Sequence, residues 1–305
     1  MSAERSSESV AQLTASVLAD DVVLAEHLPI GFGNENWRLT TSSGERFIAK
    51  FGPSSSGAKW RSAQEAQRLA ASVGVPVARL VYFGDGAEEI LRIFEWVEGI
   101  SPARLTDQAS AASRFFSELG RAVAALQSVR VEKFSSRLDG SAPSFDRWAE
   151  YIAHRLTQVR ARCEATQAFD DKDLNDIEGE IQRRADHVSD AARPALCHRD
   201  LHSDNLLARE DGSLAAILDF DQSELWDATA DWSKLDWMLF PGFPAACRDQ
   251  FGVAYRSTQP DNELWEERKT VVDLVEAYNG IPNAIANGWM AFERECRARL
   301  VTLLK

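Results

Sequence analysis

One loop and the strand that follows it constrain this chain more than any other feature. The loop has the pattern His-x-Asp-x-x-x-x-Asn, from His198 through Asp200 to Asn205, and a nearby apolar run ends at Asp219. Phosphoryl transfer from ATP needs one carboxylate at the substrate hydroxyl, and an Asn and a second carboxylate that hold magnesium on the phosphates. The spacing lets a tight loop turn Asp200 toward substrate and Asn205 toward the metal. The pattern therefore predicts a kinase, with Asp200 catalytic and with Asn205 and Asp219 as metal ligands.

Each part of this pattern also has an ordinary structural explanation when it is taken alone. Asp200 and Asn205 could cap a turn, and Asp219 could simply end a strand. Their order is more specific, because the loop is followed by a turn cluster at 209–213, an apolar strand at 214–218 and then an Asp. The combination favours catalysis over coincidence.

Composition limits the class of protein. The 305 residues suffice for two lobes, and 45% hydrophobic with 27% charged residues is typical of a globular protein. No apolar run approaches the length of a membrane span, and residues 1–10 lack the apolar stretch of a signal peptide, so we expect a cytoplasmic protein without a membrane partner. A net charge of −13 argues against nucleic acid. The four cysteines form no CxxC pair and indicate neither zinc nor disulfides.

Hydrophobic periodicity divides the chain into a strand-rich part and a helical part. After a helix at 6–20, the expected elements are strands at 22–28, 37–40, 46–51, 80–83 and 90–97, with a helix at 58–73. Beyond residue 110 the expected helices are 111–129, 145–165, 173–190, 230–239, 245–255, 263–278 and 284–304. The predicted fold class is α+β, with a small antiparallel-sheet N-terminal lobe (1–97) and a larger helical C-terminal lobe (98–305).

The strand-rich part supplies candidate nucleotide contacts. Lys50 lies in the otherwise apolar third strand, from which its ammonium would reach the ATP phosphates. Glu65, in the next helix, is the expected acidic partner of that lysine. A turn with Gly31, Gly33 and Asn34 would bring backbone amides close to phosphate oxygens. An outward-facing lysine, a solvated glutamate and a plain hairpin are the simpler alternatives, and the position of these residues relative to the catalytic loop favours function.

Two further features favour structural roles. Asp231 precedes a helical pattern and would cap it, and we expect it to brace the loop that carries Asp200. Trp226, Trp232 and Trp237 are expected in the core rather than in a ligand cage.

These residues together resemble the aminoglycoside phosphotransferase and choline kinase-like superfamily, over about residues 28 to 238. The family pattern His-Gly-Asp-x-x-x-x-Asn matches from His198 to Asn205, and the later Asp-containing segment of the family is similar to 218–232. The resemblance implies a protein-kinase-like two-lobed fold and the cofactors ATP and Mg²⁺. It also implies the roles already given to Asp200, Asn205, Asp219, Lys50 and Glu65. Residues 94–99 resemble the hinge of the family, where backbone groups of Glu95 and Val97 would meet adenine.

The chain departs from the family pattern in the catalytic loop. Arg199 replaces the usual Gly and gives the His-Arg-Asp-Leu of eukaryotic protein kinases. However, His202 stands where those enzymes have a lysine, and Asp221 replaces the glycine of Asp-Phe-Gly. The short distance from Asp219 to Asp231 leaves no room for a loop that docks a peptide, so a protein kinase is a distant alternative.

The sequence leaves the acceptor open. We expect the acceptor to be a small, cationic molecule with a hydroxyl, such as an aminoglycoside or another antibiotic. The alternative is a metabolite of the choline, thiamine, methylthioribose or fructosamine type. A nucleotide-binding pseudokinase is a remote alternative, and a monomer or homodimer is expected. Carboxylates and tryptophan could bind an amine, although acidic residues also cover ordinary surfaces. The candidates are Asp221, Glu224, Trp289 and Glu293, with Asp227, Asp236 and Glu295 nearby.

Overall fold

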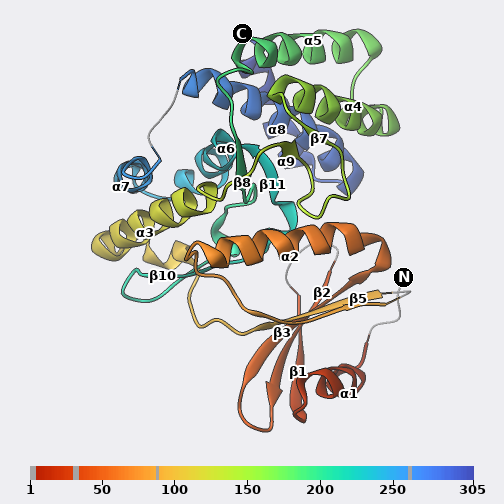
Figure 1. The fold of residues 1–305 in the computed structure, drawn as a ribbon, viewed down its shortest axis with the longest axis vertical. Coiled ribbons are helices and arrows are strands. Elements are labelled where there is room, and N and C mark those ends of the chain that lie inside the picture. The colour runs from red at the N-terminus through yellow and green to blue at the C-terminus, as the bar shows by residue number, and fades with distance from the viewer. Residues whose placement is uncertain (1–4, 30–33, 87–88, 260–262) are drawn as a thin grey trace.

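An antiparallel five-stranded sheet forms the N-terminal lobe (Figure 1). The computed structural model describes residues 5–29, 34–86, 89–259 and 263–305. The strand order is β1-β2-β3-β5-β4. The bounds are β1 (Val22–Leu28), β2 (Glu35–Thr41), β3 (Arg46–Pro53), β4 (Leu80–Asp85) and β5 (Glu89–Glu95). Helix α1 (Ser7–Leu18) packs on this sheet through Val10, which is fully buried against Trp37 and Leu39.

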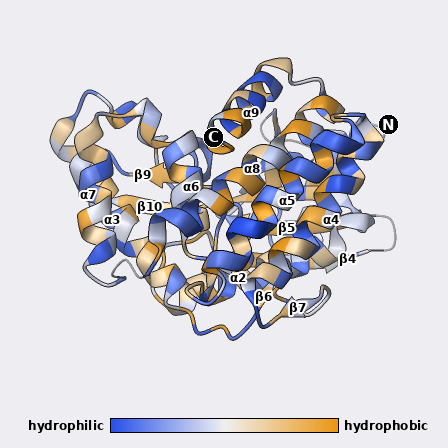
Figure 2. Cartoon of the chain, turned by 90° about the horizontal axis from the view of Figure 1, so that it is seen from above, coloured by the Kyte–Doolittle hydropathy of each residue, from blue (hydrophilic) through white to orange (hydrophobic). Residues whose placement is uncertain are grey.

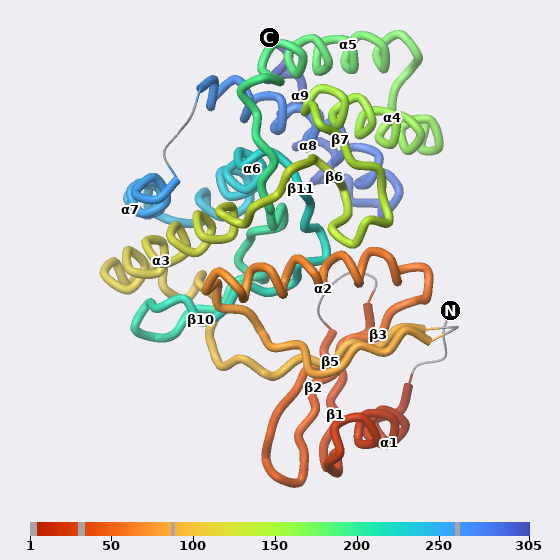
Figure 3. Tube along the Cα trace, in the orientation of Figure 1, coloured from red at the N-terminus to blue at the C-terminus, as the bar shows by residue number. Residues whose placement is uncertain are grey.

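Helices build the C-terminal lobe, and α2 (Gly57–Ser72) runs between them and the sheet (Figure 3). They are α3 (Ala109–Gln127), α4 (Trp148–Thr166), α5 (Asp171–Val188), α6 (Thr229–Met238), α7 (Ala245–Arg256), α8 (Trp265–Asn287) and α9 (Met290–Leu303). This architecture confirms the predicted α+β two-lobed fold. The division at residues 97 and 98 stays a prediction.

Short strands flank the residues of the catalytic pattern, which lie in the loops and turns between β8 and β11. A small sheet has the order β7-β6-β11-β8, and a separate hairpin pairs β9 with β10. Their bounds are β6 (Phe134–Ser135), β7 (Ser144–Phe145), β8 (Pro194–Cys197), β9 (Leu206–Ala208), β10 (Leu214–Ile217) and β11 (Glu224–Asp227). The hairpin is joined to the preceding chain by backbone bonds from Ile217 N to Pro76 O and between Ile100 and Ala208. The hairpin that follows the catalytic loop is therefore bonded to two segments of the preceding chain.

Apolar periodicity explains why the helices pack as they do. In α3, Phe115, Phe116, Leu119, Val123 and Leu126 are fully buried, and their three- and four-residue spacing places them on one face. Complete burial of each such side chain stabilises the fold by roughly 1.5–3 kcal/mol. Hydrophilic and hydrophobic residues accordingly alternate along the helices (Figure 2).

The last two helices divide at a different residue from the one predicted. The sequence pattern suggests a break between 278 and 284, but α8 continues through Pro282 to Asn287. Pro282 removes one helical donor, and burial of the surrounding Tyr278, Ile281 and Ala284 holds the helix together. The break falls at Gly288, whose φ of +71° is the left-handed conformation that ends helices.

Candidate active site

The catalytic loop leaves β8 and is held by its own histidine. His198 is fully buried, and its Nε2 lies 2.9 Å from the carbonyl oxygen of Leu218. Its Nδ1 accepts a hydrogen bond from the Asp200 amide at 3.2 Å, so the ring joins the loop to the end of β10. The edge-on contact with Phe220, at 4.7 Å between ring centroids, fixes the ring further. His198 thus orients the loop and does not itself face substrate.

Asp200 and Asn205 meet at the turn of this loop. The Asn205 side-chain amide donates to the Asp200 carbonyl oxygen at 2.8 Å and to its carboxylate Oδ2 at 3.1 Å. The Asp200 side chain keeps 31% of its surface exposed, so a ligand can reach it. Burial alone would raise the pKa of Asp200, but the hydrogen bond from His202 and the positive charge of Lys234 outweigh it and lower the pKa to about 2. Asp200 is ionised at neutral pH.

Asp219 lies between the two lobes. Its Oδ2 accepts from the Lys50 ammonium at 3.2 Å, and its backbone has a left-handed φ of +58°. Burial would raise the pKa of Asp219, and the adjacent Lys50 charge more than offsets this, so the pKa is lowered. The amide of Leu218 donates to the Asn205 carbonyl oxygen at 2.8 Å. The structure therefore brings Asp200, Asn205, Asp219 and Lys50 into one connected site.

The side-chain oxygens of this site suit a hard divalent cation. Magnesium prefers oxygen ligands and keeps several waters, so one carboxylate and one amide oxygen suffice. Among the described residues, every side-chain contact of Asn205 is made by Nδ2. Its Oδ1 can therefore accept a cation. The carboxylate of Asp219 pairs with Lys50 through Oδ2 and accepts a long hydrogen bond from the Asp221 amide through Oδ1 at 3.4 Å. These two residues fit magnesium by the chemistry of their donors.

The expected contact between Lys50 and Glu65 does not form. Glu65 instead accepts from Arg68 at 2.6 and 2.8 Å, and this bond is the main cause that lowers the pKa of Glu65. The face of α2 that packs inward carries Ala63, Ala66 and Ala70. Glu65 lies beside that face with a guanidinium one helical turn away, so the nearer cation takes its carboxylate.

The other predicted nucleotide residues are placed as follows. Gly31 and Gly33 lie outside the described residues, and Asn34 directly precedes β2. At the hinge, the Glu95 amide donates to the Arg79 carbonyl oxygen, and the Glu95 side chain pairs with Arg79. Within the part of the chain that the structure describes, the Val97 amide has no backbone acceptor. It remains available to a ligand.

The carboxylates expected to bind a cationic acceptor are paired within the protein. Asp221 receives a bidentate contact from Arg92 at 2.7 and 2.9 Å, and Glu224 pairs with Arg155 at 3.1 Å and Arg199 at 2.6 Å. All of these side chains are at most 10% exposed. Arginines that the sequence pattern did not associate with Asp221 and Glu224 therefore neutralise both carboxylates. Their contact with an acceptor stays a prediction.

Of the two C-terminal candidates, Glu293 is paired in the same way. Glu293 pairs with Arg297 along α9 at 2.8 Å, while Trp289, before α9, is 37% exposed. The neighbouring acids are also paired: Asp227 with Arg268, Asp236 with Arg248 and Lys269, and Glu295 with the Trp237 indole. The carboxylates expected near the acceptor are therefore engaged in ion pairs and hydrogen bonds within the protein.

Asp231 braces the catalytic loop, which confirms its predicted structural role. It lies in the first turn of α6 rather than before it. Its carboxylate accepts from the Arg199 amide at 2.8 Å and from Gln127 at 2.9 Å. Complete burial raises its pKa against these hydrogen bonds.

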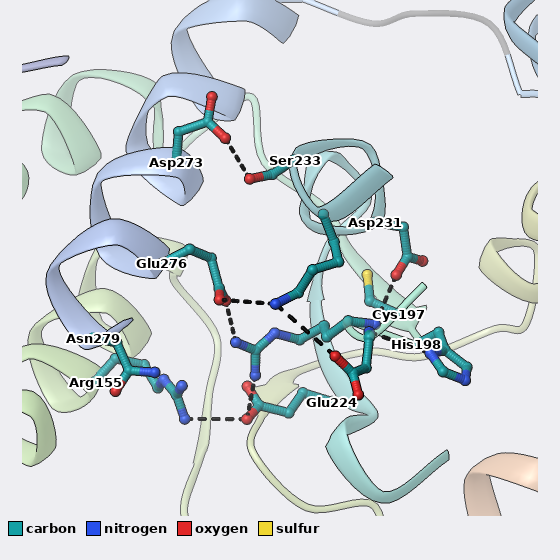
Figure 4. A network of polar contacts seen from close by, with 12 residues as sticks. Arg155, Cys197, His198, Glu224, Asp231, Ser233, Asp273, Glu276 and Asn279 are labelled. Carbon is teal, nitrogen blue, oxygen red and sulfur yellow. Dashed lines mark hydrogen bonds and ion pairs between the residues drawn. The ribbon is translucent and has the colours of Figure 1, made fainter. Parts of the chain in front are cut away.

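A polar network that sequence reasoning missed continues from the loop (Figure 4). Arg199 pairs with both Glu224 and Glu276, and its guanidinium lies 4.2 Å from the centre of the Trp226 ring. Lys234, one turn after Asp231, lies 4.0 Å from the Asp200 carboxylate and 3.9 Å from that of Glu276. The sequence indicated the proximity of Lys234 to the loop only through its position in the helix that begins near Asp231.

Fold and loop together define a kinase-like phosphotransferase. The Phosphotransferase enzyme family matches residues 25–280, and this chain belongs to that family. It is accordingly a small-molecule phosphotransferase, and the predicted resemblance is confirmed.

Solved structures share the fold at low sequence identity. A thermostable mutant of aminoglycoside phosphotransferase APH(4)-Ia is 14% identical with a TM-score of 0.75, over 96% of this chain and 98% of its own. A putative fructosamine-3-kinase from Thermobifida fusca YX-ER1 is 21% identical with a TM-score of 0.73, over the same shares. The gentamicin complex of APH(2")-IIa is 15% identical with a TM-score of 0.70, over 99% and 96%.

Two further findings are negative. No curated protein sequence matches this chain. Every helix in the described ranges is too short or too polar to cross a membrane.

Proposed function

We propose that the protein transfers the γ-phosphoryl group of ATP to a hydroxyl of a small molecule. The observation that carries this proposal is the connected set of Asp200, Asn205, Asp219 and Lys50. In the transfer, the bond from the acceptor oxygen to the γ-phosphorus forms and the bond from that phosphorus to the ADP oxygen breaks. The hydroxyl proton passes to the Asp200 carboxylate.

The low pKa of Asp200 defines how it contributes. A carboxylate with a pKa of about 2 is a weak base toward an ordinary alcohol. Asp200 therefore orients the hydroxyl through a hydrogen bond and receives the proton as the oxygen becomes acidic during bond formation. Its exposed fraction and its hydrogen bond to Asn205 support this assignment.

Asn205 and Asp219 would hold magnesium, and Lys50 would contact the nucleotide phosphates. Bound magnesium would neutralise charge on the phosphates. With nucleotide present, Lys50 would share its ammonium between Asp219 and a phosphate oxygen. The Val97 amide would donate a hydrogen bond to adenine, and the carbonyl oxygen of Glu95 would accept one from it. Structures of related fold were obtained with ADP and with AMP-PNP, each together with hygromycin B.

For the acceptor, we propose a sugar-like molecule that carries hydroxyls. The structural relatives are named as kinases of aminoglycosides and of fructosamine, two groups of compounds that join hydroxyls to amines. A cationic antibiotic remains our first candidate and a fructosamine-type metabolite the second. Neither rests on the predicted carboxylates, since those are paired internally.

Coupled measurement of ADP release tests this function. Wild-type protein with Mg-ATP is mixed with aminoglycosides, fructosamines, choline, thiamine and methylthioribose. We expect acceptor-dependent ADP release well above the rate with water alone, together with a phosphorylated product in the mass spectrum. Binding of ATP without release for any compound would instead support a pseudokinase.

A further inference from the structure

Lys234 places an ammonium beside the catalytic carboxylate, in long ion pairs with two carboxylates and 5.9 Å from the centre of the Trp237 ring. Its Nζ lies 4.0 Å from Asp200 Oδ1 and 3.9 Å from Glu276 Oε2, both beyond hydrogen-bond distance. Among the contacts of the described residues, Nζ has no closer acceptor, and the side chain is 17% exposed. A lysine ammonium has three N–H donors. Lys234 can therefore donate to a ligand that reaches Asp200.

The two oxygens of Asp200 face different surroundings. Oδ2 lies 3.1 Å from the Asn205 amide and 3.6 Å from His202 Nε2, which is the side of the proposed metal ligands. Oδ1 is the oxygen that approaches Lys234. If the phosphates lie on the metal side, the body of the acceptor would extend past Oδ1, toward Lys234.

The other cations around Lys234 already have partners. The Arg199 guanidinium is 7% exposed and pairs with Glu224 and Glu276. Lys269 contacts Asp236 at 3.2 Å and Asp273 at 3.0 Å. Glu276 is shared between Arg199 and Lys234 (Figure 4). An amine that entered here would meet the charge of Lys234, and the carboxylates near that charge, Glu276 and Asp200, already have partners among the described residues.

We propose that Lys234 determines specificity by donating a hydrogen bond to an acceptor oxygen adjacent to the reacting hydroxyl. The preferred acceptor then carries a second oxygen, as a vicinal hydroxyl or a carboxylate, where an amino analogue would carry an ammonium. This inference rests on the proposed function and narrows its substrate class. Amines elsewhere on the acceptor are compatible with it.

The size of the effect follows from the chemistry of the ammonium. Hydrogen bonds to a charged group contribute more than neutral ones and correspond to about ten- to hundredfold in affinity. Two ammonium groups at short range repel each other, most strongly where water is partly excluded. An acceptor with an oxygen next to the reacting hydroxyl should therefore have a kcat/KM at least about tenfold higher than its analogue with an amine at that position.

Matched acceptors test the proposal. Each compound that supports ADP release is compared with an analogue in which the hydroxyl next to the reacting one is replaced by an amine. We expect wild-type protein to prefer the hydroxyl compound by about tenfold or more in kcat/KM. Lys234→Met should remove this preference by weakening use of the hydroxyl compound, and Lys234→Glu should reverse it. The KM for ATP should stay unchanged.

Lys269→Met is the control, since Lys269 is a paired lysine on α8, and it should keep the wild-type preference. Circular dichroism establishes folding of each variant, with Lys234→Gln as the substitute if Lys234→Met does not fold. An unchanged preference in the Lys234 variants overturns the inference, as does a raised KM for ATP without a change in preference. Absence of ADP release with every compound overturns the proposed function and the inference with it, whereas release without discrimination overturns only the inference.

Discussion

Arg199 holds a backbone conformation in which arginine is rare. Its φ of +64° is left-handed and costs a non-glycine residue about 1–2 kcal/mol. The conformation directs the Arg199 amide to Asp231 at 2.8 Å and its guanidinium to Glu224 and Glu276. These contacts offset the strain. They also explain how the chain tolerates arginine where the family pattern has glycine.

Replacement of Asp200 by asparagine tests its role in catalysis. Asp200→Asn keeps the shape of the side chain but removes the carboxylate that receives the hydroxyl proton. We expect turnover to fall by about 10²- to 10⁴-fold with little change in ATP affinity. Steady-state ADP release and nucleotide titration measure the two quantities. The control is Asp204→Asn, because the Asp204 side chain is 89% exposed, and near-normal turnover in Asp200→Asn would refute the assignment.

Loss of the Lys50 ammonium should affect the nucleotide more than the acceptor. Lys50 contacts Asp219 at 3.2 Å, and a charge-assisted bond to phosphate corresponds to roughly ten- to hundredfold in affinity. Lys50→Ala should raise the KM for ATP by about that factor and leave the KM for the acceptor nearly unchanged. Lys172→Ala, an exposed lysine on α5, should change neither. A nucleotide complex with Lys50 turned away from the phosphates would contradict this prediction.

At the scale of elements, the periodic segments were predictable and their polar partners were not. Long apolar patterns predicted α3 and the strands β1 and β3 close to their observed bounds. The two-residue strands β6 and β7 are too short for a periodic signal, and the end of α8 depends on the conformation of Gly288 rather than on Pro282.

In the candidate site, too, local residues were predictable and remote ion-pair partners were not. Local spacing predicted Asp200 and Asn205 because one loop carries both. The ion pairs of Glu224 and Asp221 could not be predicted, because their partners Arg155 and Arg92 are remote in the sequence. Likewise, the pairing of Glu65 depends on which face of α2 turns inward. Such choices are fixed by packing rather than by spacing.

The ion pair between Glu276 on α8 and Arg199 in the catalytic loop should stabilise the fold in a pH-dependent way. Burial would raise the pKa of Glu276, but Arg199 and Lys234 outweigh it and lower the pKa below 4.5. Its contribution is therefore fully present above about pH 4.5 and is lost as the pH falls through the lowered pKa. Glu276→Gln should reduce the free energy of unfolding by about 3 kcal/mol at pH 7, because it removes one partner of a buried pair.

Urea unfolding at pH 7 and pH 4 measures this difference. The gap between wild-type protein and Glu276→Gln should be smaller at pH 4 than at pH 7. Glu267→Gln replaces an exposed glutamate of the same helix and should change stability by less than about 0.5 kcal/mol. A gap that is equal at both pH values and persists to lower pH would show that the charge of Glu276 is not its cause.

At the scale of the whole molecule, two ion pairs connect the N-terminal sheet to one turn of the C-terminal lobe. Lys50 on β3 reaches Asp219, and Arg92 on β5 reaches Asp221. Lys50 and Arg92 are cross-strand neighbours, so both cations leave the same face of the sheet. The Arg92 guanidinium also lies 3.7 Å from the centre of the Trp60 ring on α2. We therefore expect the orientation of the lobes and the position of the proposed metal ligand to depend on each other.

Arg92→Met should lower the stability of the fold and also weaken the use of Mg-ATP. It leaves Asp221 buried without its partner, and we expect a loss of about 3 kcal/mol in the free energy of unfolding and a raised KM for Mg-ATP. In the double variant Arg92→Met/Asp221→Leu, apolar packing replaces the buried pair, so most of the stability should return. The KM for Mg-ATP should remain raised, because Asp219 has lost the fixed turn beside it. If the double variant recovered both stability and KM, the ion pair would stabilise the fold without positioning Asp219.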